Sequence, residues 1–218
     1  MALKLYFAPG ACSFVPHALL ENSGQPFEAV LVKLHKGEQK QPAFTAVNPR
    51  AQVPVLVDGE QAITQILAIV QHLDAKFPDQ QFLPRQQLAR TRVLETLAWM
   101  NNTVHPTFTH VFMPYKFAES PQAQAELKAF NAKVYAGLLA EIEAMAQKAA
   151  AAGQPFLGGD HFGPLDAYAL TLLRWGGYAK IDPTGYTALW AHVQKIAGLP
   201  GLQRAMARER LELNVYQP

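Results

Sequence analysis

The chain has 218 residues, of which half are hydrophobic and 17% are charged, and its formal net charge is +2. The length suits one large domain or two small ones, and the composition is ordinary for a globular protein. The weak net charge and the absence of a dense Lys/Arg run argue against nucleic acid or an acidic membrane surface as the main partner.

The cysteine content and the apolar segments indicate the cellular compartment. Cys12 is the only cysteine, which excludes an internal disulfide framework and fits a reducing environment. The first residues contain no charged-then-apolar signal segment, and no apolar stretch reaches the roughly 18 residues that a bilayer span needs. We therefore expect a cytoplasmic protein with no membrane partner.

The stretch that contains Cys12 joins a predicted strand over residues 3–7 to a predicted helix over residues 13–23. Pro9 and Gly10 break the strand, so the cysteine falls where the helix begins. A thiol there meets unpaired backbone N–H groups and the positive end of the helix dipole, which predicts a lowered pKa and a nucleophilic sulfur. The alternative is a buried, inert cysteine. The strand–turn–helix setting favours the reactive interpretation, because ligand sites form at such sheet edges.

The next fifty residues complete a small mixed sheet. Residues 27–32 predict a second strand, and the polar, basic residues 33–46 predict a loop with irregular helical turns. Asp58-Gly59 between two apolar runs predicts a tight hairpin, whose strands must be antiparallel. An apolar helix over residues 66–73 follows, which gives an α/β unit of strand–helix–strand, connector and strand–strand–helix.

Pro54 stands directly before a strand that should be central in this sheet. Its missing N–H is tolerated where that backbone edge faces a ligand or a bend. The Val53-Pro54 bond is a candidate for the cis isomer, and a trans proline at the first position of the strand is the alternative.

The character of the chain changes after Pro84. Almost no β-like alternation remains, which predicts an all-α second half joined by a proline-containing linker. Gly163 and Asp166 mark one helix start, where the carboxylate can bond back to the N–H of the capping glycine. The helical patterns cover residues 88–102, 123–152, 165–178, 187–196 and 202–208.

Several motifs carry a resemblance to a known family. With the order of the predicted elements, they make the chain resemble the glutathione transferase family, most closely the bacterial beta class, nearly from end to end. The resemblance implies a thioredoxin-like α/β domain over residues 1–80, a linker at about 81–85, an all-helical domain over residues 86–218, and a homodimer. The motifs are Gly10-Ala11-Cys12-Ser13, Asn48-Pro49-x-x-x-Val53-Pro54, the segment 95–112 around His105, and Asp166-Ala167-Tyr168 with Leu173-Arg174-Trp175.

The resemblance also implies glutathione as co-substrate, bound in the cleft between the domains. Cys12 would approach the glutathione sulfur, Tyr6 and Ser13 would act as auxiliary hydroxyls, and His105 would border the thiol; a solvent-facing or capping histidine is the alternative for His105. We expect no metal site, because His105, His110 and Cys12 lack metal-ligand spacing. The implied glutathione contacts are Lys36 at the glycyl end, Val53 before a cis Pro54 at the cysteinyl part, Gln65 and Ile66 at the γ-glutamyl end, and Gln52, Asn102, Thr103 and Val104.

The chain departs from the family pattern at the γ-glutamyl end. The family usually has Glu followed by Ser or Gly, where this chain has Gln65-Ile66. A neutral amide loses charge assistance toward the ligand ammonium, which costs about 1.5–3 kcal/mol, or roughly 10- to 100-fold in affinity. Ala51 in place of the usual Gly, Ala98 in place of a frequent Asn, and Pro106 after His105 are further departures.

Two classes of function follow. The first is a glutathione-dependent transferase or thiol-disulfide exchange enzyme acting on small electrophiles or mixed disulfides. Val15 stands where a dithiol motif would have its second cysteine, so exchange would use glutathione as the resolving thiol. The second class is a non-catalytic binding or regulatory protein, which Gln65-Ile66 favours. A transferase for another thiol or acid ligand is a third possibility.

Five aromatic side chains have two interpretations, an apolar pocket for the electrophile or ordinary core packing. They are Trp99, Phe108, Phe112, Tyr115 and Trp175.

Overall fold

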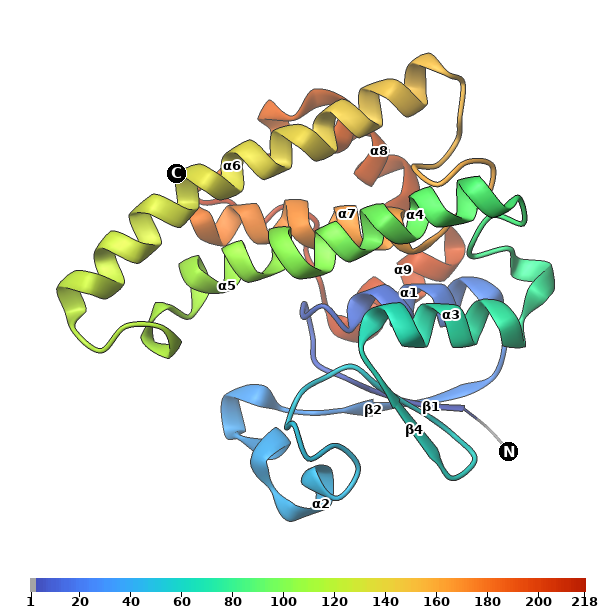
Figure 1. The fold of residues 1–218 in the computed structure, drawn as a ribbon, viewed down its shortest axis with the longest axis horizontal. Helices are drawn as coiled ribbons and strands as arrows, with labels where there is room; N and C mark the ends of the chain where they lie inside the picture. Colours follow the sequence, from blue (N-terminus) through green and yellow to red (C-terminus); the bar gives the residue numbers. More distant parts are fainter. Residues whose placement is uncertain (1–2) are drawn as a thin grey trace.

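The computed structural model describes residues 3–218. Figure 1 shows a twisted sheet at one end of the molecule and a bundle of helices at the other, with α1 and α3 lying between them. The predicted architecture, a thioredoxin-like α/β unit followed by an all-helical region, is confirmed. None of the described helices combines the length and the apolar composition that crossing a membrane requires.

The sheet has four strands in the order β2-β1-β3-β4. The central strand β1 (Leu3–Phe7) pairs in parallel with β2 (Phe27–Leu31) and antiparallel with β3 (Val55–Asp58). The edge strand β4 (Gln61–Thr64) completes the predicted hairpin, whose two turn residues are Gly59 and Glu60 rather than Asp58-Gly59. The register differs from the prediction because Asp58 still pairs with Gln61 across the ladder.

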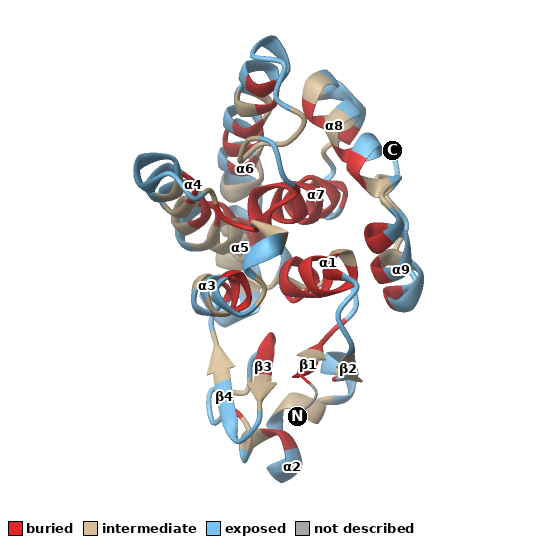
Figure 2. Cartoon of the chain, turned by 90° about the vertical axis from the view of Figure 1, so that its right-hand side faces the viewer, coloured by how far each residue is buried: buried red, intermediate tan, exposed pale blue. Residues whose placement is uncertain are grey.

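Helices cover the two faces of the sheet unequally. α1 (Phe14–Ser23) and α3 (Ile66–Lys76) pack on one face, and α2 (Pro42–Thr45) inserts Phe44 against the other. All residues of α1 except Asn22 are buried, because this helix lies between the sheet and the helical bundle (Figure 2). The predicted irregular turns before α2 are two short 3₁₀ helices, at Leu34–Lys36 and Glu38–Lys40.

The second half is helical, as predicted, and is organised around α7 (Pro164–Gly176), in which every residue is buried (Figure 2). The predicted cap is confirmed, since the Gly163 N–H donates to Asp166 Oδ2 at 2.9 Å. A Cβ at Gly163 would lie 2.9 Å from the carbonyl oxygen of Phe82, so a larger residue would not fit there. The other long helices are α4 (Gln87–Trp99), α5 (His105–Phe112), α6 (Pro121–Ala151), α8 (Thr187–Ala197) and α9 (Pro200–Glu209), with 3₁₀ turns at Pro78–Gln80, Pro114–Lys116, Gly177–Ala179 and Pro183–Gly185.

The helix predicted over residues 88–102 does not end there. It passes through a π-helical turn at Met100–Val104 and continues as α5. Pro106 has no N–H to donate within an α-helix and its ring crowds the preceding turn, and a wider turn just before it removes that conflict. The predicted boundary at residue 102 was wrong, because the helix continues through the π turn into α5.

A buried carboxylate holds the segment that connects the two halves. Asp74 on α3 is 1% exposed and accepts hydrogen bonds from the Leu83 N–H (3.0 Å), Arg85 Nη1 (3.0 Å) and Arg90 Nη1 (2.7 Å). The predicted linker at residues 81–85 lies within this clamped stretch, and the division of the chain there stays a prediction.

We expect Asp74→Ala to lower the free energy of unfolding by about 2–3 kcal/mol, because the buried Leu83 N–H and two arginines lose their acceptor. Urea denaturation followed by circular dichroism measures the change. Glu95→Ala, which breaks the exposed Arg92–Glu95 pair on α4, is the matched control and should leave the midpoint unchanged. Equal midpoints for both variants would contradict a stabilising role for the hydrogen bonds of Asp74.

Candidate active site

Cys12 lies in the loop between β1 and α1, one residue before the N-cap Ser13. Its thiol donates to the carbonyl oxygen of Val53 at 3.7 Å. The peptide bond from Val53 to Pro54 is cis, as the resemblance implies. The only thiol of the chain therefore lies against the backbone that leads into β3.

The predicted lowering of the Cys12 pKa is wrong for the protein without a ligand. Burial raises the pKa of Cys12 to about 12, and the charge of Glu209 adds to the rise. The backbone N–H groups of Cys12 and Ser13 act in the opposite direction, but their effect is smaller. The residue as a whole is partly exposed, while its sulfur packs against the core, so Cys12 rests as a thiol.

The hydroxyl of Ser13 closes the loop on itself. Ser13 is fully buried, and its Oγ accepts from the Ala8 N–H (3.1 Å) and donates to the Ala8 carbonyl (3.2 Å). The resemblance implies an auxiliary role for this hydroxyl, but in the structure both of its hydrogen bonds are made with the backbone of Ala8, directly after β1.

The helical half of the molecule holds the same loop from the outside. The Gly10 N–H donates to Glu209 Oε2 at 2.8 Å, and the Gly10 carbonyl accepts from Trp175 Nε1 at 2.7 Å. Gly10 has a φ of 68°, and a Cβ there would lie 2.9 Å from Arg174 Nη1. The positive φ is the feature that favours glycine at this position.

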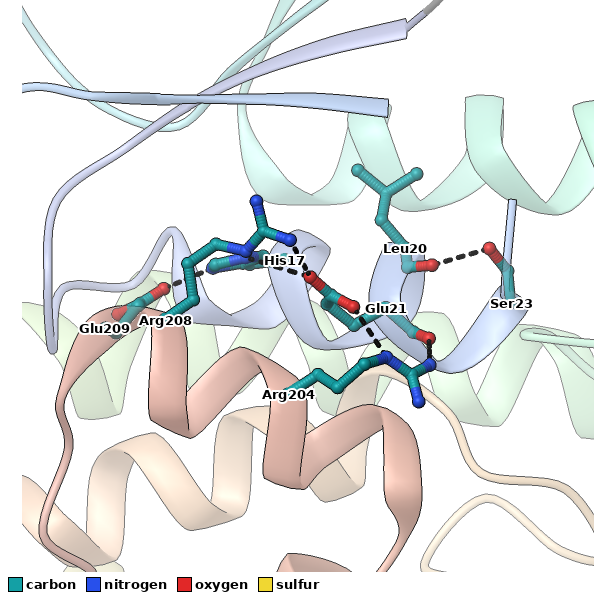
Figure 3. A network of polar contacts seen from close by, with 7 residues as sticks. All are labelled: His17, Leu20, Glu21, Ser23, Arg204, Arg208 and Glu209. Carbon is teal, nitrogen blue, oxygen red and sulfur yellow. Dashed lines mark hydrogen bonds and ion pairs between the residues drawn. The ribbon is translucent and has the colours of Figure 1, made fainter. Parts of the chain in front are cut away.

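Figure 3 shows the polar network that ties α9 to α1 beside this loop. His17 is fully buried, and its Nδ1 lies 2.6 Å from Glu209 Oε1. One turn further along α1, Glu21 accepts from Arg204 Nε and pairs with Arg208 Nη2, each at 3.0 Å. His17 therefore lies at the interface between the thioredoxin-like half and the helical half.

His105, the first residue of α5, belongs to a second polar cluster. Its Nδ1 lies 2.8 Å from the hydroxyl of Tyr168 on α7, and its ring packs edge-on against Trp175 at a centroid distance of 4.8 Å. Burial lowers the pKa of His105 to about 4, so the imidazole is neutral at pH 7. Burial raises the pKa of Tyr168, and a negative charge on Cys12 would raise it further.

Tyr6 points away from this region. Along β1 the side chains of Leu5 and Phe7 are buried beneath the helices, whereas Tyr6 lies on the opposite face, edge-on to Phe44 at 5.7 Å. There it lines a hollow of about 420 Å³ together with Lys4 and other residues of the outer face. No hydrogen bond joins Tyr6 to Cys12 within the part of the chain that the structure describes.

Two of the implied glutathione contacts offer backbone groups. Within residues 3–218 the Val53 N–H has no backbone partner, and Ile66 begins α3, where helical N–H groups are free. The side chain of Ile66 is 2% exposed in the core, so only its backbone can meet a ligand. Gln65 caps this helix with φ 70° and ψ 128°, a strained conformation for a residue with a side chain.

The other implied contacts divide into exposed and buried residues. Lys36 and Gln52 are exposed, and the Gln52 carbonyl accepts from Asn48 Nδ2 at 2.7 Å. In the π turn, Asn102 and Thr103 are exposed, whereas the side chain of Val104 is sealed in the core and cannot reach a ligand.

The predicted aromatic wall is a stack that runs from the core to the surface. Phe108 is buried and stacks on Trp175 (4.7 Å) and on Phe112 (5.5 Å), and Phe112 is half exposed. Trp99 packs partly buried against the core, and Tyr115 is exposed. Among residues 3–218, no three His, Cys, Asp or Glu side chains are grouped so that they could hold a metal ion.

Comparison with known proteins gives the same architecture. A family model described as the glutathione S-transferase N-terminal domain matches residues 1–75. The chain is 32% identical to glutathione S-transferase GstA of Escherichia coli O157:H7, over 96% of this chain and 100% of that protein. A sphingomonad glutathione S-transferase solved with glutathione is 33% identical, with a TM-score of 0.80 and coverage of 96% of this chain and 100% of its own. The bacterial beta class enzyme of Sphingomonas chungbukensis is 28% identical, with a TM-score of 0.82 and coverage of 96% and 100%.

A thioredoxin-like unit followed by a helical region is the architecture of the glutathione S-transferase structures that this chain matches. The chain belongs to the glutathione S-transferase family, as its motifs predict.

The raised pKa of Cys12 predicts slow alkylation in the absence of glutathione. We expect iodoacetamide to modify the native protein at pH 7.5 at least roughly tenfold more slowly than the urea-unfolded protein, whose thiol has a pKa near 8.5. Because the thiolate forms only as the pH approaches 12, the native rate should keep rising through pH 10. Mass spectrometry of the modified chain measures both rates, and a plateau below pH 8 would contradict the expectation.

Proposed function

We propose that this protein is a glutathione-dependent transferase, acting on small electrophiles or mixed disulfides, in which the glutathione sulfur binds beside Cys12. The observation that carries the proposal is the 3.7 Å contact of the Cys12 thiol with the Val53 carbonyl, next to the free N–H of the same residue. An extended peptide that pairs with Val53 would bring its own thiol to Cys12. Support comes from the relatives, one of which was solved with bound glutathione.

The resting state of Cys12 favours glutathione as the nucleophile. An ordinary thiol has a pKa of about 8.5, whereas that of Cys12 is raised to about 12. At pH 7 the glutathione thiol therefore ionises first, and the Cys12 S–H is a hydrogen-bond donor beside it. Conjugation then proceeds by attack of the glutathione thiolate on the electrophile, with release of the leaving group.

Exchange on a mixed disulfide uses Cys12 more directly. Its sulfur attacks the glutathione sulfur of the mixed disulfide, the other thiol leaves with the proton, and an enzyme–glutathione disulfide remains. A second glutathione attacks this disulfide, which restores Cys12 and releases oxidised glutathione. Val15 occupies the position of a resolving cysteine, so the second thiol must come from solution.

The surface of the helical half supports an apolar co-substrate and a second copy of the chain. The segment where α5 ends and α6 begins lies at the left edge of Figure 1, and large apolar side chains are exposed along it. We assign the Trp175–Phe108–Phe112 stack to the electrophile and the outer part of this surface to a homodimer contact in a reducing, cytoplasmic setting. The exposed residues are Phe112, Tyr115, Phe117, Phe130 and Val134.

A binding or regulatory role is the competing proposal. Gln65 presents no carboxylate to a ligand ammonium, and Cys12 is protonated at rest. A calorimetric titration of the purified protein with glutathione separates the two. Saturable binding at millimolar concentrations or below supports the transferase, and no binding supports the competing role or a transferase for another thiol or acid ligand.

We expect Cys12→Ala to abolish turnover of a mixed glutathione disulfide, because that reaction passes through a bond to the Cys12 sulfur. Conjugation of an activated aryl halide should fall less than roughly tenfold, since only one hydrogen bond to the glutathione thiolate is lost. Parallel assays of the two reactions measure the difference. Exchange that persists unchanged would remove Cys12 from the mechanism.

Gln65→Glu should tighten glutathione binding by roughly 10- to 100-fold, because it restores a charge-assisted contact to the γ-glutamyl ammonium. Isothermal titration calorimetry measures the change in Kd. Gln71→Glu adds the same charge to an exposed site on α3 and is the matched control. If both variants change Kd equally, the effect is one of net charge and Gln65 does not face the ligand.

A further inference from the structure

Hydrogen bonds join three polar side chains of the helical half, of which Tyr168 is fully buried and the other two are partly buried. Asn101 lies in the π turn, Tyr168 on α7 and His105 at the start of α5. The Tyr168 hydroxyl lies 2.8 Å from His105 Nδ1 and donates to Asn101 Oδ1 at 3.3 Å. Tyr168 is fully buried, so its hydroxyl has no access to bulk water.

The orientation of the Asn101 amide sets the direction of both hydrogen bonds. Asn101 Nδ2 donates to Asn102 Oδ1 at 3.0 Å, which leaves Asn101 Oδ1, an acceptor only, facing Tyr168. A phenol has one proton, and here it goes to Asn101. The contact between Tyr168 and His105 is then a hydrogen bond only if Nδ1 carries a proton and donates it.

The other imidazole nitrogen is free. His105 Nε2 makes no hydrogen bond to residues 3–218, and in the neutral ring with Nδ1 protonated it carries a lone pair. The lowered pKa of His105 agrees with a neutral ring at pH 7. The ring packs on Trp175, whose Nε1 holds the Gly10 carbonyl, so His105 and the cysteine loop share one rigid support.

We propose that Tyr168 and Asn101 are positioning residues that hold His105 in the Nδ1–H tautomer, so that Nε2 accepts a hydrogen bond from the bound thiol. The inference rests on the proposed function for the identity of that thiol. Without Tyr168 and Asn101 the two tautomers would compete, and the Nε2–H form would present a donor where the thiol needs an acceptor. The pair acts through His105 and does not touch the substrate.

The direct test is the tautomer of His105 in the ligand-free protein. Long-range ¹H–¹⁵N spectra of histidine-labelled protein should show a pyrrole-type shift for Nδ1 and a pyridine-type shift for Nε2. In Tyr168→Phe the Nε2–H tautomer should appear. This readout needs no glutathione. A failure of the proposed function would be seen as absent glutathione binding in calorimetry, whereas a failure of this inference would be seen as the wrong tautomer of His105.

The kinetic test separates the effect of Tyr168 on His105 from the general effect of removing a buried hydroxyl. Tyr168→Phe should lower kcat/KM for conjugation roughly tenfold and leave KM for glutathione within about twofold, as expected for one hydrogen bond. Tyr135→Phe is the matched control, because Tyr135 is also fully buried and donates its one hydroxyl proton to the Leu172 carbonyl at 2.6 Å. It should change neither kcat/KM nor the tautomer.

Asn101 gives a second route if Tyr168→Phe does not fold. Asn101→Leu removes the acceptor, which frees the Tyr168 proton for His105 Nδ1 and should convert the ring to the Nε2–H form. Asn101→Asp keeps an acceptor oxygen and should retain the wild-type tautomer. An Nε2–H ring in the wild type, an unchanged tautomer in Tyr168→Phe or Asn101→Leu, or an equal loss of activity in Tyr135→Phe overturns the proposal.

Discussion

The carboxylate of Glu209 is the contact on which the geometry of the site depends. A buried carboxylate is costly unless its oxygens find donors, and this one takes them from both ends of the cysteine loop region, the Gly10 N–H and His17 Nδ1. Because those donors belong to the thioredoxin-like half and the acceptor to the last long helix, α9 stabilises the shape of the loop. The Trp175 indole donates to the carbonyl of the same residue, Gly10. Cys12 therefore lies on a loop held from three directions, by α1, α7 and α9.

The same support explains why Cys12 is not an activated thiolate at rest. A helix N-terminus favours the anion, but here the packing that holds the loop also removes water from the sulfur, and a second anion, Glu209, lies nearby. Desolvation is the larger effect. The site thus holds Cys12 as a neutral thiol that donates to the Val53 carbonyl, and burial keeps His105 neutral as well. Such an environment suits a reaction in which the incoming thiol, rather than the protein's own, carries the charge.

Local signals in the sequence predicted much of the fold, and long-range contacts account for what they missed. The strand at residues 3–7, the hairpin and the Gly163–Asp166 cap each depend on residues within a few positions of one another. The hydrogen bond from Gly10 to Glu209 joins residues 199 positions apart, and no pattern in the sequence marks Glu209 as the acceptor. Tyr6 is different, because the alternation of Leu3, Leu5 and Phe7 already placed it on the opposite face of the strand from the buried residues. The resemblance assigned it to the site against that signal.

Backbone strain marks the two turns that flank the implied ligand contacts. Ala51 (φ 54°) precedes Val53 by two residues, and Gln65 (φ 70°) directly precedes Ile66. A left-handed conformation costs a residue with a side chain roughly 1–2 kcal/mol, and glycine would adopt it freely. Each strained residue presents a neighbouring backbone N–H, that of Val53 or that of Ile66, as an unpaired donor. Strain of this kind persists where the surrounding structure imposes it and concentrates at ligand sites. Ala51 and Gln65, two of the departures from the family pattern, are thus the two residues near the implied ligand contacts that hold a conformation favouring glycine.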